Sequence, residues 1–190
     1  MLEHTLPTLF KTERLLLRKH QLKLATKMFA AVDGDRARLR QFLPWVDGIR
    51  SSADETAYIR QTHQQWTACQ MFDYGLFRQL DQQYLGNLGV HHIVWAHARC
   101  ELGYWILGQY EGQGYMSEAV RGLEALLFSQ GFNRIEIRCS SLNLRSAAIP
   151  RRLGYVHEGT LRQACWEQKQ WRDTLIFARL AQDNSCALNV

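Results

Sequence analysis

The sequence contains no uninterrupted run of roughly 18 apolar residues, the length that a membrane-spanning helix requires. Residues 1–11 also have no apolar stretch after a basic start, so no secretion signal is expected. From these two absences we predict a protein that stays in the cytoplasm and has no membrane partner.

Cysteine and runs of basic residues are scarce as well. The five cysteines are odd in number, widely spaced and without a C-x-x-C pair. Neither a disulfide framework nor a structural zinc site is therefore expected, and we predict reduced thiols and no bound metal. The formal net charge of +5 suits an anionic partner. However, no Lys or Arg run has the length of a nucleic-acid-binding arm, and no nucleic-acid-binding motif is present.

The sequence does contain enough apolar residues for a full core, at 46% of 190 residues. This length predicts a single domain over 1–190, with its core at about 12–180 and a tail without pattern over 181–190.

The first third of the chain is typical of one strand followed by helices. Ser52-x-x-Glu55 is a capping-box signal, which predicts the start of a helix. Apolar residues at helical spacing precede it. The expected elements are a strand over 13–18 and helices over 20–32, 36–43 and 53–68.

The rest of the chain alternates strands with two helices. Three strands joined by short turns predict an antiparallel meander, with a bulge at the glycines of its second strand. An amphipathic helix follows, ended by Gly131, and it leads into a crossover that is right-handed if its two strands are parallel neighbours. The expected strands cover 72–78, 84–95, 100–107, 134–140, 155–164 and 173–180, and the helices 116–130 and 144–153. Together they predict an α/β (α+β) chain with one central mixed sheet.

The most informative segment is the glycine-containing loop that joins an apolar strand to the helix over 116–130. The first N–H groups of such a helix are unpaired and its dipole is positive there. Gly112 and Gly114 remove the side chains that would keep a pyrophosphate away from the backbone, so the loop predicts an anion site without a lysine. The Gly-Lys-Ser/Thr of a Walker A loop is missing, and Ser117 replaces the third glycine of the dinucleotide fingerprint. ATP and NAD are therefore disfavoured.

Gln109-x-x-Gly112-x-Gly114 resembles the Q/R-x-x-G-x-G/A signature of the GNAT superfamily of N-acetyltransferases, which bind the pyrophosphate of acetyl-CoA on this loop. Other segments resemble the RimJ/RimL branch, which acetylates ribosomal proteins at the N-terminal α-amine. They follow in the right order as 12–18 (TERLLLR), 42–45 (FLPW), 101–106 (ELGYWI), 114–119 (GYMSEA), Asn143-x-x-Ser146 with 153–155 (LGY), and 172–180 (RDTLIFARL). The resemblance implies the GNAT fold, in which a mostly antiparallel, twisted sheet flanked by helices splays open around the cofactor.

The resemblance also implies that acetyl-CoA is the co-substrate. In that case the Leu107 backbone pairs with the pantetheine amides, and the N–H groups from Gln109 to Ser117 hold the pyrophosphate. Asn143 contacts the pantetheine arm, although its position also suits a helix cap. The implied cofactor-binding residues are Leu107, Gln109, Gly112, Gln113, Gly114, Tyr115, Met116, Ser117, Asn143 and Ser146.

Direct attack of an amine on a thioester needs a base, an N–H donor for the oxyanion and an acid for the departing thiolate. We expect the Leu107 amide to be the oxyanion donor. The usual acid of the family, a Tyr seven residues after the Asn, is replaced here by Pro150. RimL-type members resemble this chain in a Ser three residues after the Asn. Ser146 is therefore the expected acid, with a plain helix-start role as the alternative.

The base is where the sequence departs from the family. RimL-type proteins have a Glu after a Gln-Ala dipeptide on the penultimate strand, whereas here Cys165 follows that dipeptide. A thiol acts as a base only if its pKa is lowered. We expect Glu101, on the strand that lines the slot, to be the base, directly or through water, with Glu167 second. Either residue is equally an ordinary surface carboxylate.

Three aromatic or polar positions are expected to contact the acceptor, namely Trp45, Cys165 and Glu167, with Trp45 as a lid at a helix end. His91 and His92 are neighbours on a strand, so one should face inward, where it would reach the acceptor cleft, and the other outward.

Three functions remain open at this stage. The first is a RimL-like enzyme that acetylates a protein N-terminus, whose α-amine has a pKa of about 7.7–8.0 and so needs little help from a base. The second acetylates a polyamine or aminoglycoside, and a deep acidic pocket would favour it over an open groove for a protein tail. The third is a CoA-binding module without turnover. RimL-type proteins are often dimers, so a homodimer is one expectation.

Overall fold

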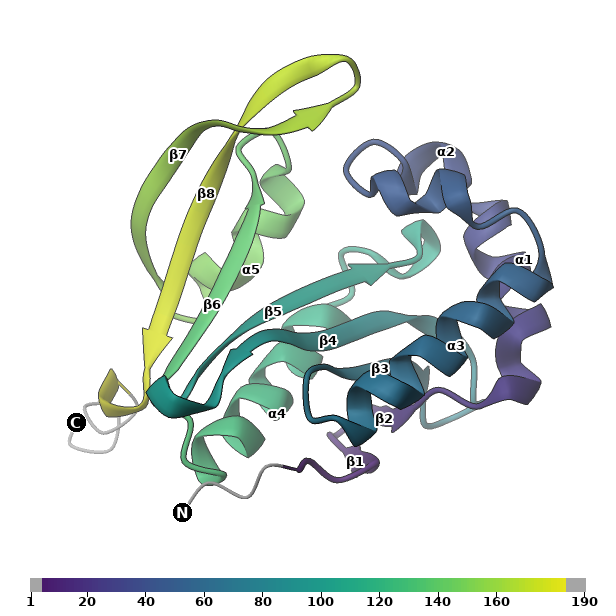
Figure 1. Ribbon diagram of the computed structural model, residues 1–190, viewed down its shortest axis with the longest axis horizontal. Coiled ribbons are helices and arrows are strands. Elements are labelled where there is room, and N and C mark those ends of the chain that lie inside the picture. The colour runs from purple at the N-terminus through teal and green to yellow at the C-terminus, as the bar shows by residue number, and fades with distance from the viewer. Residues whose placement is uncertain (1–4, 184–190) are drawn as a thin grey trace.

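The computed structural model describes residues 5–183, which form an eight-stranded sheet with helices on both faces (Figure 1). The strand order is β1-β2-β3-β4-β5-β6-β8-β7. The strands are β1 (Leu9–Lys11), β2 (Leu15–Lys19), β3 (Phe72–Arg78), β4 (Tyr84–Val94), β5 (Arg99–Ile106), β6 (Arg134–Ser140), β7 (Val156–Glu167) and β8 (Gln170–Leu180). The helices are α1 (Ala25–Gly34), α2 (Arg36–Leu39), α3 (Ser52–Thr67), α4 (Tyr115–Ser129) and α5 (Leu144–Arg152).

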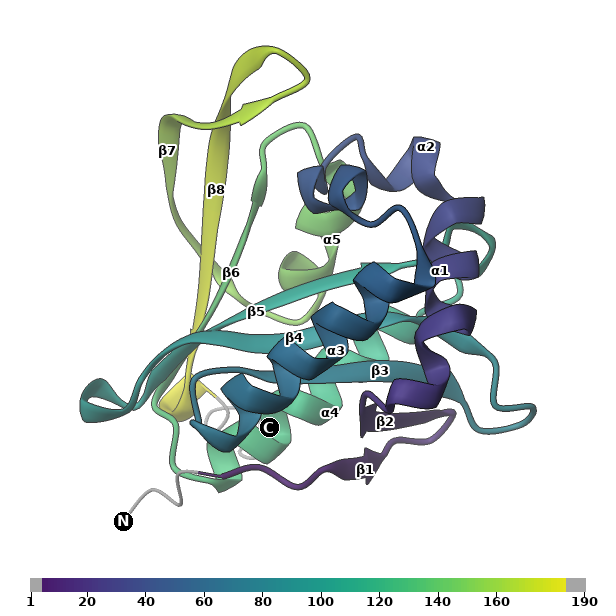
Figure 2. The ribbon, with the colours of Figure 1, turned by 45° about the vertical axis from the view of Figure 1, so that its right-hand side comes forward.

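The helices cover the sheet in two layers, with α1 and α3 on one face and α4 on the other (Figures 1 and 2). The apolar stripe of α4 has helical spacing and is buried against the sheet, which makes the main core. A smaller core on the other face joins α1 and α3 to β3 and β4 through Met28, Ile59, Phe77 and Tyr84. None of the described helices is both long and apolar enough to span a membrane.

The predicted meander and crossover are confirmed. Strands β3, β4 and β5 pair antiparallel, and a register shift opposite Tyr84 and Gly86 places a bulge at the first glycine of β4. Strands β5 and β6 are parallel neighbours joined through α4. Their pairing runs from Arg99–Arg134 to Leu102–Ile137 and then stops, although both strands continue. The two strands therefore diverge into a splay, as Figures 1 and 2 show.

The predicted capping box of α3 is wrong by one residue. Ser51 is the N-cap and accepts a hydrogen bond from the Asp54 N–H, at 3.3 Å. The Asp54 carboxylate in turn accepts from the Arg50 N–H, at 3.0 Å. Because Ser51 and Asp54 cap the helix, Glu55 takes no part in capping and is buried instead.

Other element boundaries differ from the expectations for local reasons. Strand β1 is three residues long, too short for an alternating pattern, and was not predicted. The helix expected over 36–43 is α helical only to Leu39. Strands β7 and β8 continue past 164 and start before 173 because an exposed hairpin extends them without a buried face. Of the predicted tail, 184–190 lies outside the described residues.

Candidate active site

The loop between β5 and α4 presents a row of free backbone donors. Gly112 and Gly114 have φ angles of 73° and 80°, a left-handed conformation that glycine adopts without strain. The Glu118 N–H bonds to the Gly114 carbonyl at 3.0 Å, so hydrogen bonding of α4 begins there. Within the described part of the chain, the N–H groups from Gly112 to Ser117 donate to no acceptor. Free donors of this kind at a helix start suit an anion, as the sequence predicts, although the Tyr110 and Glu111 N–H groups of the predicted range are bonded within the loop.

The loop is held in place by the α1–α2 corner. The Asp35 carboxylate accepts a hydrogen bond from the Gly108 N–H at 2.8 Å. Burial alone would raise the pKa of Asp35, but its hydrogen bonds with Arg38 and Gly108 outweigh burial and lower the pKa. Arg38 donates to the Ile106 carbonyl at 2.5 Å and to Glu111 at 2.6 Å. These bonds fix the loop without using the amides that follow it.

Two arginines that the sequence did not single out lie at the same helix start. Arg152 of α5 donates to the Ser117 hydroxyl at 3.0 Å and has no carboxylate partner among residues 5–183. Arg14 donates to the Gln113 carbonyl at 3.0 Å, but it also pairs with Glu118 at 2.6 Å. Arg152 therefore adds an available positive charge to the free amides, which favours a phosphate there.

The role predicted for the Leu107 backbone is wrong. Its N–H donates to the Leu85 carbonyl at 2.8 Å, and its carbonyl accepts from the Tyr110 N–H at 2.9 Å. The N–H is therefore not open to a ligand and cannot be the oxyanion donor. Backbone groups alternate in direction along a strand, so the N–H groups of Ile106 and Tyr104 face the opposite way, toward the splay. Ile106 is thus the residue that offers a donor to this gap.

Asn143 is the N-cap of α5, which is one of the two roles predicted for it. Its side-chain oxygen accepts from the Ser146 N–H at 3.1 Å, which leaves the amide nitrogen without a partner in the described chain. The cap fixes both side chains at the end of β6, beside the splay.

The predicted acid, Ser146, lies against Tyr104 of β5. Pro150 has no N–H, so the Ser146 carbonyl one turn earlier lacks its usual helical partner. The Tyr104 hydroxyl donates to this carbonyl at 3.0 Å, and the Ser146 hydroxyl donates to Tyr104 at 3.5 Å. Burial raises the pKa of Tyr104, so the phenol stays protonated. Because Pro150 leaves the Ser146 carbonyl without a helical donor, this carbonyl can accept the hydrogen bond from Tyr104 that joins α5 to β5 across the splay.

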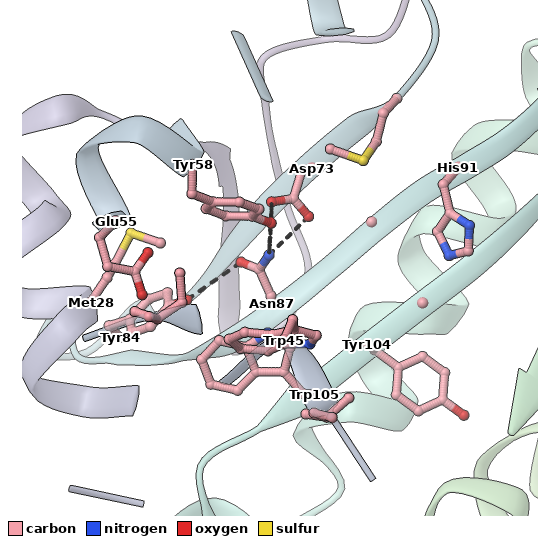
Figure 3. Close-up of a pocket in the computed structure, with 15 residues that line it drawn as sticks. Met28, Trp45, Glu55, Tyr58, Asp73, Tyr84, Asn87, His91, Tyr104 and Trp105 are labelled. Atoms are coloured by element: carbon pink, nitrogen blue, oxygen red, sulfur yellow. Dashed lines mark hydrogen bonds between the residues drawn. The ribbon is translucent and has the colours of Figure 1, made fainter. Parts of the chain in front are cut away.

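A cavity of about 410 Å³ opens beside Tyr104 on the α1 and α3 face of the sheet (Figure 3). Its walls are largely apolar and aromatic and include Met28, Tyr84 and Trp105. Trp45, which the sequence placed at the acceptor, lines it too, with its ring 5.8 Å from that of Trp105 and 41% of its surface exposed. The structure thus brings Trp45 and the Ser146 partner Tyr104 to one cavity.

The floor of this cavity carries a bonded carboxylate, Asp73. It accepts from the Tyr58 hydroxyl at 2.6 Å and from the Asn87 amide at 2.8 Å (Figure 3). The His20 ring nitrogen lies 3.0 Å from the same carboxylate. Burial alone would raise the pKa of Asp73, but His20, Tyr58 and Asn87 outweigh it and lower the pKa. Asp73 is therefore an ionised carboxylate with its partners supplied by the protein.

A second carboxyl in the same cavity, Glu55, has no such partners. Its side chain is 2% exposed, yet it forms no hydrogen bond or ion pair within the described chain. Burial raises its pKa to about 7, with the nearby Asp73 adding to the rise and His20 opposing it.

His91 and His92 do not lie on opposite sides of a regular strand, but, as predicted, one of them reaches the cavity, namely His91, whereas the His92 side chain is 76% exposed. A bulge follows His91, and His92 has a φ angle of 49°, so both rings lie together with centroids 4.7 Å apart. The His92 ring contacts His91 at 3.2 Å and the Glu101 carboxylate at 3.0 Å. His91 lines the cavity, and burial lowers its pKa, so its ring is neutral at pH 7.

His91, His92 and Glu101 also place their donor atoms within 4.8 Å of one another, close enough to hold a metal ion. Arg138 lies 3.4 Å from the same Glu101 oxygen that faces His92, and its positive charge competes with a cation there.

The other two predicted acceptor residues lie elsewhere. Cys165 and Glu167 contact each other at 3.5 Å on the β7–β8 hairpin, and neither lines the cavity. Burial raises the pKa of Cys165, which makes its thiol unsuitable as a base. The hairpin turn does reach the other side of the site, because the Gln168 amide donates to the Gln41 carbonyl at 3.3 Å.

Comparison with known proteins agrees with this geometry. Residues 14–156 match the family model described as an acetyltransferase (GNAT) domain. The chain is 25% identical to a putative ribosomal N-acetyltransferase, YdaF, of Bacillus subtilis, over 90% of this chain and 93% of that protein. It is 26% identical to the ribosomal-protein-serine acetyltransferase of Escherichia coli, over 80% and 85% of the two chains.

The fold is also that of a solved structure, the ribosomal L7/L12 α-N-protein acetyltransferase RimL in complex with coenzyme A. The TM-score is 0.86 at 24% identity, over 90% of this chain and 97% of that one. The free amides, the splay and these matches lead to one identification: the chain belongs to the GNAT family of N-acetyltransferases and is of the RimJ/RimL type.

Proposed function

We propose that this protein transfers the acetyl group of acetyl-CoA to a primary amine, most naturally the N-terminal α-amine of a protein, by direct attack. The observation that carries the proposal is the continuity between the two halves of the site. Tyr104 contacts Ser146 across the splay and also lines the cavity, so a thioester in the splay would meet an amine in the cavity. The names of the relatives, which refer to ribosomal proteins, support a protein N-terminus.

The residues present fit acetyl-CoA as the co-substrate. The free N–H groups from Gly112 to Ser117, with Arg152 beside them, suit a pyrophosphate. The splay offers the Ile106 N–H and the Asn143 amide to the pantetheine arm. These assignments replace the Leu107 backbone with that of Ile106, retain Gly112 to Ser117 and Asn143, and give no role to Gln109.

The chemistry follows from three groups around Tyr104. Neutral His91 takes the proton of the attacking ammonium, and the negative charge of the nearby Glu101 carboxylate, which contacts His92, balances the new positive charge. The amine nitrogen then attacks the carbonyl carbon, and the Ile106 N–H stabilises the oxyanion. When the carbon–sulfur bond breaks, Ser146 gives its proton to the thiolate and takes up the second proton that the amine nitrogen loses as the amide forms. Glu101 thus acts through its charge and not as the base itself.

A small-molecule amine is the second candidate acceptor. The cavity of about 410 Å³, with the carboxyls of Glu55 and Asp73 on its wall, is the observation that favours it. Pockets of this size are typical of small ligands, whereas a protein tail is more often bound in an open groove.

The test is release of free CoA thiol when the protein is incubated with acetyl-CoA and a panel of acceptors. Turnover of peptides with a free N-terminus, abolished by prior N-acetylation of the peptide, is the expected result. Turnover of polyamines or aminoglycosides alone would transfer the assignment to small molecules. Binding of acetyl-CoA by calorimetry without turnover of any amine would overturn the enzymatic proposal in favour of a CoA-binding module.

A further inference from the structure

We propose that the cavity recognises a second positively charged group on the acceptor, carried at the end of an unbranched aliphatic chain, and that Glu55 is its partner. The proposal rests on the proposed function, since it takes the cavity to be the acceptor site. It names the class of acceptor, namely an amine with a distal cation.

The first support is the state of Glu55. Nearly all buried polar groups in proteins have a hydrogen-bond partner, because an unpaired one costs free energy. Asp73 in the same cavity is bonded by Tyr58, Asn87 and His20, whereas Glu55 is 2% exposed and has no partner within residues 5–183. Glu55 is not needed for the cap of α3 either, because Ser51 and Asp54 provide it. A ligand that supplies donors would explain a carboxyl left in this position.

The walls of the cavity support the aliphatic chain and its charge. Met28, Leu43 and Ile49 present apolar surface that suits methylene groups. Trp45, Trp105 and Tyr84 present aromatic rings, which attract a cation. No lysine or arginine in the described residues lines the cavity, so nothing there repels a positive group. An aminoglycoside, with hydroxyl groups on every ring, would find few partners on such walls.

The position of Glu55 in the cavity indicates how the acceptor is oriented. In Figure 3, Glu55 projects from α3 beside Tyr84, whereas Tyr104 and His91 lie on the opposite side of the cavity. The amine to be acetylated would lie by His91 and Tyr104, with the second cation at Glu55. A free diamine or polyamine and an N-terminal lysine residue of a protein share this chemistry, and the experiment separates them.

The experiment compares kcat/KM for two matched pairs of acceptors. The first pair is 1,5-diaminopentane and pentylamine, and the second is a short peptide that begins with lysine and the same peptide that begins with norleucine. We expect the charged member of at least one pair to be preferred tenfold or more. The pair that shows the preference identifies the source of the cation.

The variants assign the preference to Glu55. In Glu55→Gln the preference should fall to within about twofold, because the charged member loses far more of its kcat/KM than the uncharged one, and Glu55→Asp should keep part of it. The control is Glu158→Gln, which changes the net charge equally but removes a partner of Arg134 that does not line the cavity. It should keep the full preference.

Two outcomes would overturn the proposal: no preference in the wild type, or a preference that persists in Glu55→Gln, including the case in which both members of a pair lose rate equally. Failure of the proposed function looks different, because then no amine is turned over although acetyl-CoA binds. In that case tryptophan fluorescence, which reports on Trp45 and Trp105, is titrated with 1,5-diaminopentane. If the diamine binds the wild type and binds Glu55→Gln ten times more weakly, the proposed cation site is supported. If the diamine does not bind the wild type, the cation site is rejected.

Discussion

The two halves of the site differ in how the chain builds them. The cofactor loop is one continuous segment, in which the backbone amides of residues 112–117 and the nearby Arg152 present positive potential. The cavity is assembled from α1, α3, β3, β4, β5 and the turn Pro44–Gly48, and presents aromatic rings and carboxyls. The first suits an anion and the second a cation. The comparison shows that a backbone site is encoded locally, whereas a side-chain cavity depends on the packing of distant segments.

A substitution at Gly112 should have the largest effect and should affect only the cofactor half of the site. We predict that Gly112→Ala lowers CoA affinity by about a hundredfold, because a methyl group in the loop displaces the phosphate from amides that contribute about 1.5–3 kcal/mol each. Binding of cationic amines in the cavity should be unchanged. Calorimetry with CoA and fluorescence with a diamine measure the two effects.

Gly154 provides the matched control for this substitution. Its φ angle is 79° against 73° at Gly112, and an added Cβ meets nothing within 4 Å at either glycine. Both alanine variants should therefore lose a similar 1–2 kcal/mol of stability through backbone strain, and only Gly112→Ala should lose CoA affinity. Equal CoA affinities in the two variants would show that the loop amides do not hold the phosphate.

The junction between the two halves is the next test. Tyr104→Phe should lower kcat about tenfold, because Ser146 loses its orienting partner, and should cost about 1–3 kcal/mol of stability, because the Ser146 carbonyl is left without a donor. Adding Pro150→Ala restores a helical N–H to that carbonyl. The double variant should regain stability in urea denaturation but not kcat. Recovery of both would mean that Tyr104 has only a structural role.

The cavity half makes a pH-dependent prediction about stability. The pKa of Glu55 is raised from 4.5 to about 7 in the folded protein, so the folded state binds more protons than the unfolded state between these values. Stability should therefore fall as the pH rises from 4.5 to 7 and stay low above it. At about 1.4 kcal/mol per pKa unit, less an allowance for water in the cavity, Glu55→Gln should stabilise the protein by about 2 kcal/mol at pH 8.

Urea denaturation of wild type and Glu55→Gln at pH 4 and pH 8 measures this difference. We expect little difference at pH 4, where the carboxyl is protonated in both states. A variant that is less stable than the wild type at pH 8 would contradict the prediction that ionised Glu55 destabilises the folded protein, since it would mean that the carboxylate has a stabilising partner.

The sequence predicted the fold to the extent that its patterns are local. Strands β3 and β6 have the predicted bounds, because each alternates or fills with apolar residues over its whole length. Strand β1 and the end of the β7–β8 hairpin were missed because they bury no continuous face. The Ser51 cap was misplaced because three residues within one turn, Ser51, Ser52 and Asp54, all have capping side chains.

The residues of the candidate site, too, could be predicted where they lie in short local motifs and not where they depend on packing. The glycines and Ser146 come from short motifs, and they remain in place as proposed residues. The direction of the Leu107 N–H depends on the register of β5 against β4, and the common side of His91 and His92 depends on a bulge; neither has a pattern in the sequence. Glu55 and Asp73 are 18 residues apart, and only the packing of α3 on β3 brings them to one cavity.

The smallest expected effect concerns Cys165, which the sequence placed at the acceptor and the structure places on the hairpin. We predict that Cys165→Ser changes kcat/KM by less than twofold at any pH between 6 and 9, because the thiol has a raised pKa and lies outside the cavity. Steady-state kinetics across this range provides the measurement, with His91→Gln as a contrast that should lose activity at every pH. If Cys165→Ser instead removed a basic limb from the wild-type pH profile, a thiolate would be part of the reaction, and the acceptor site would have to include the hairpin as well as the cavity.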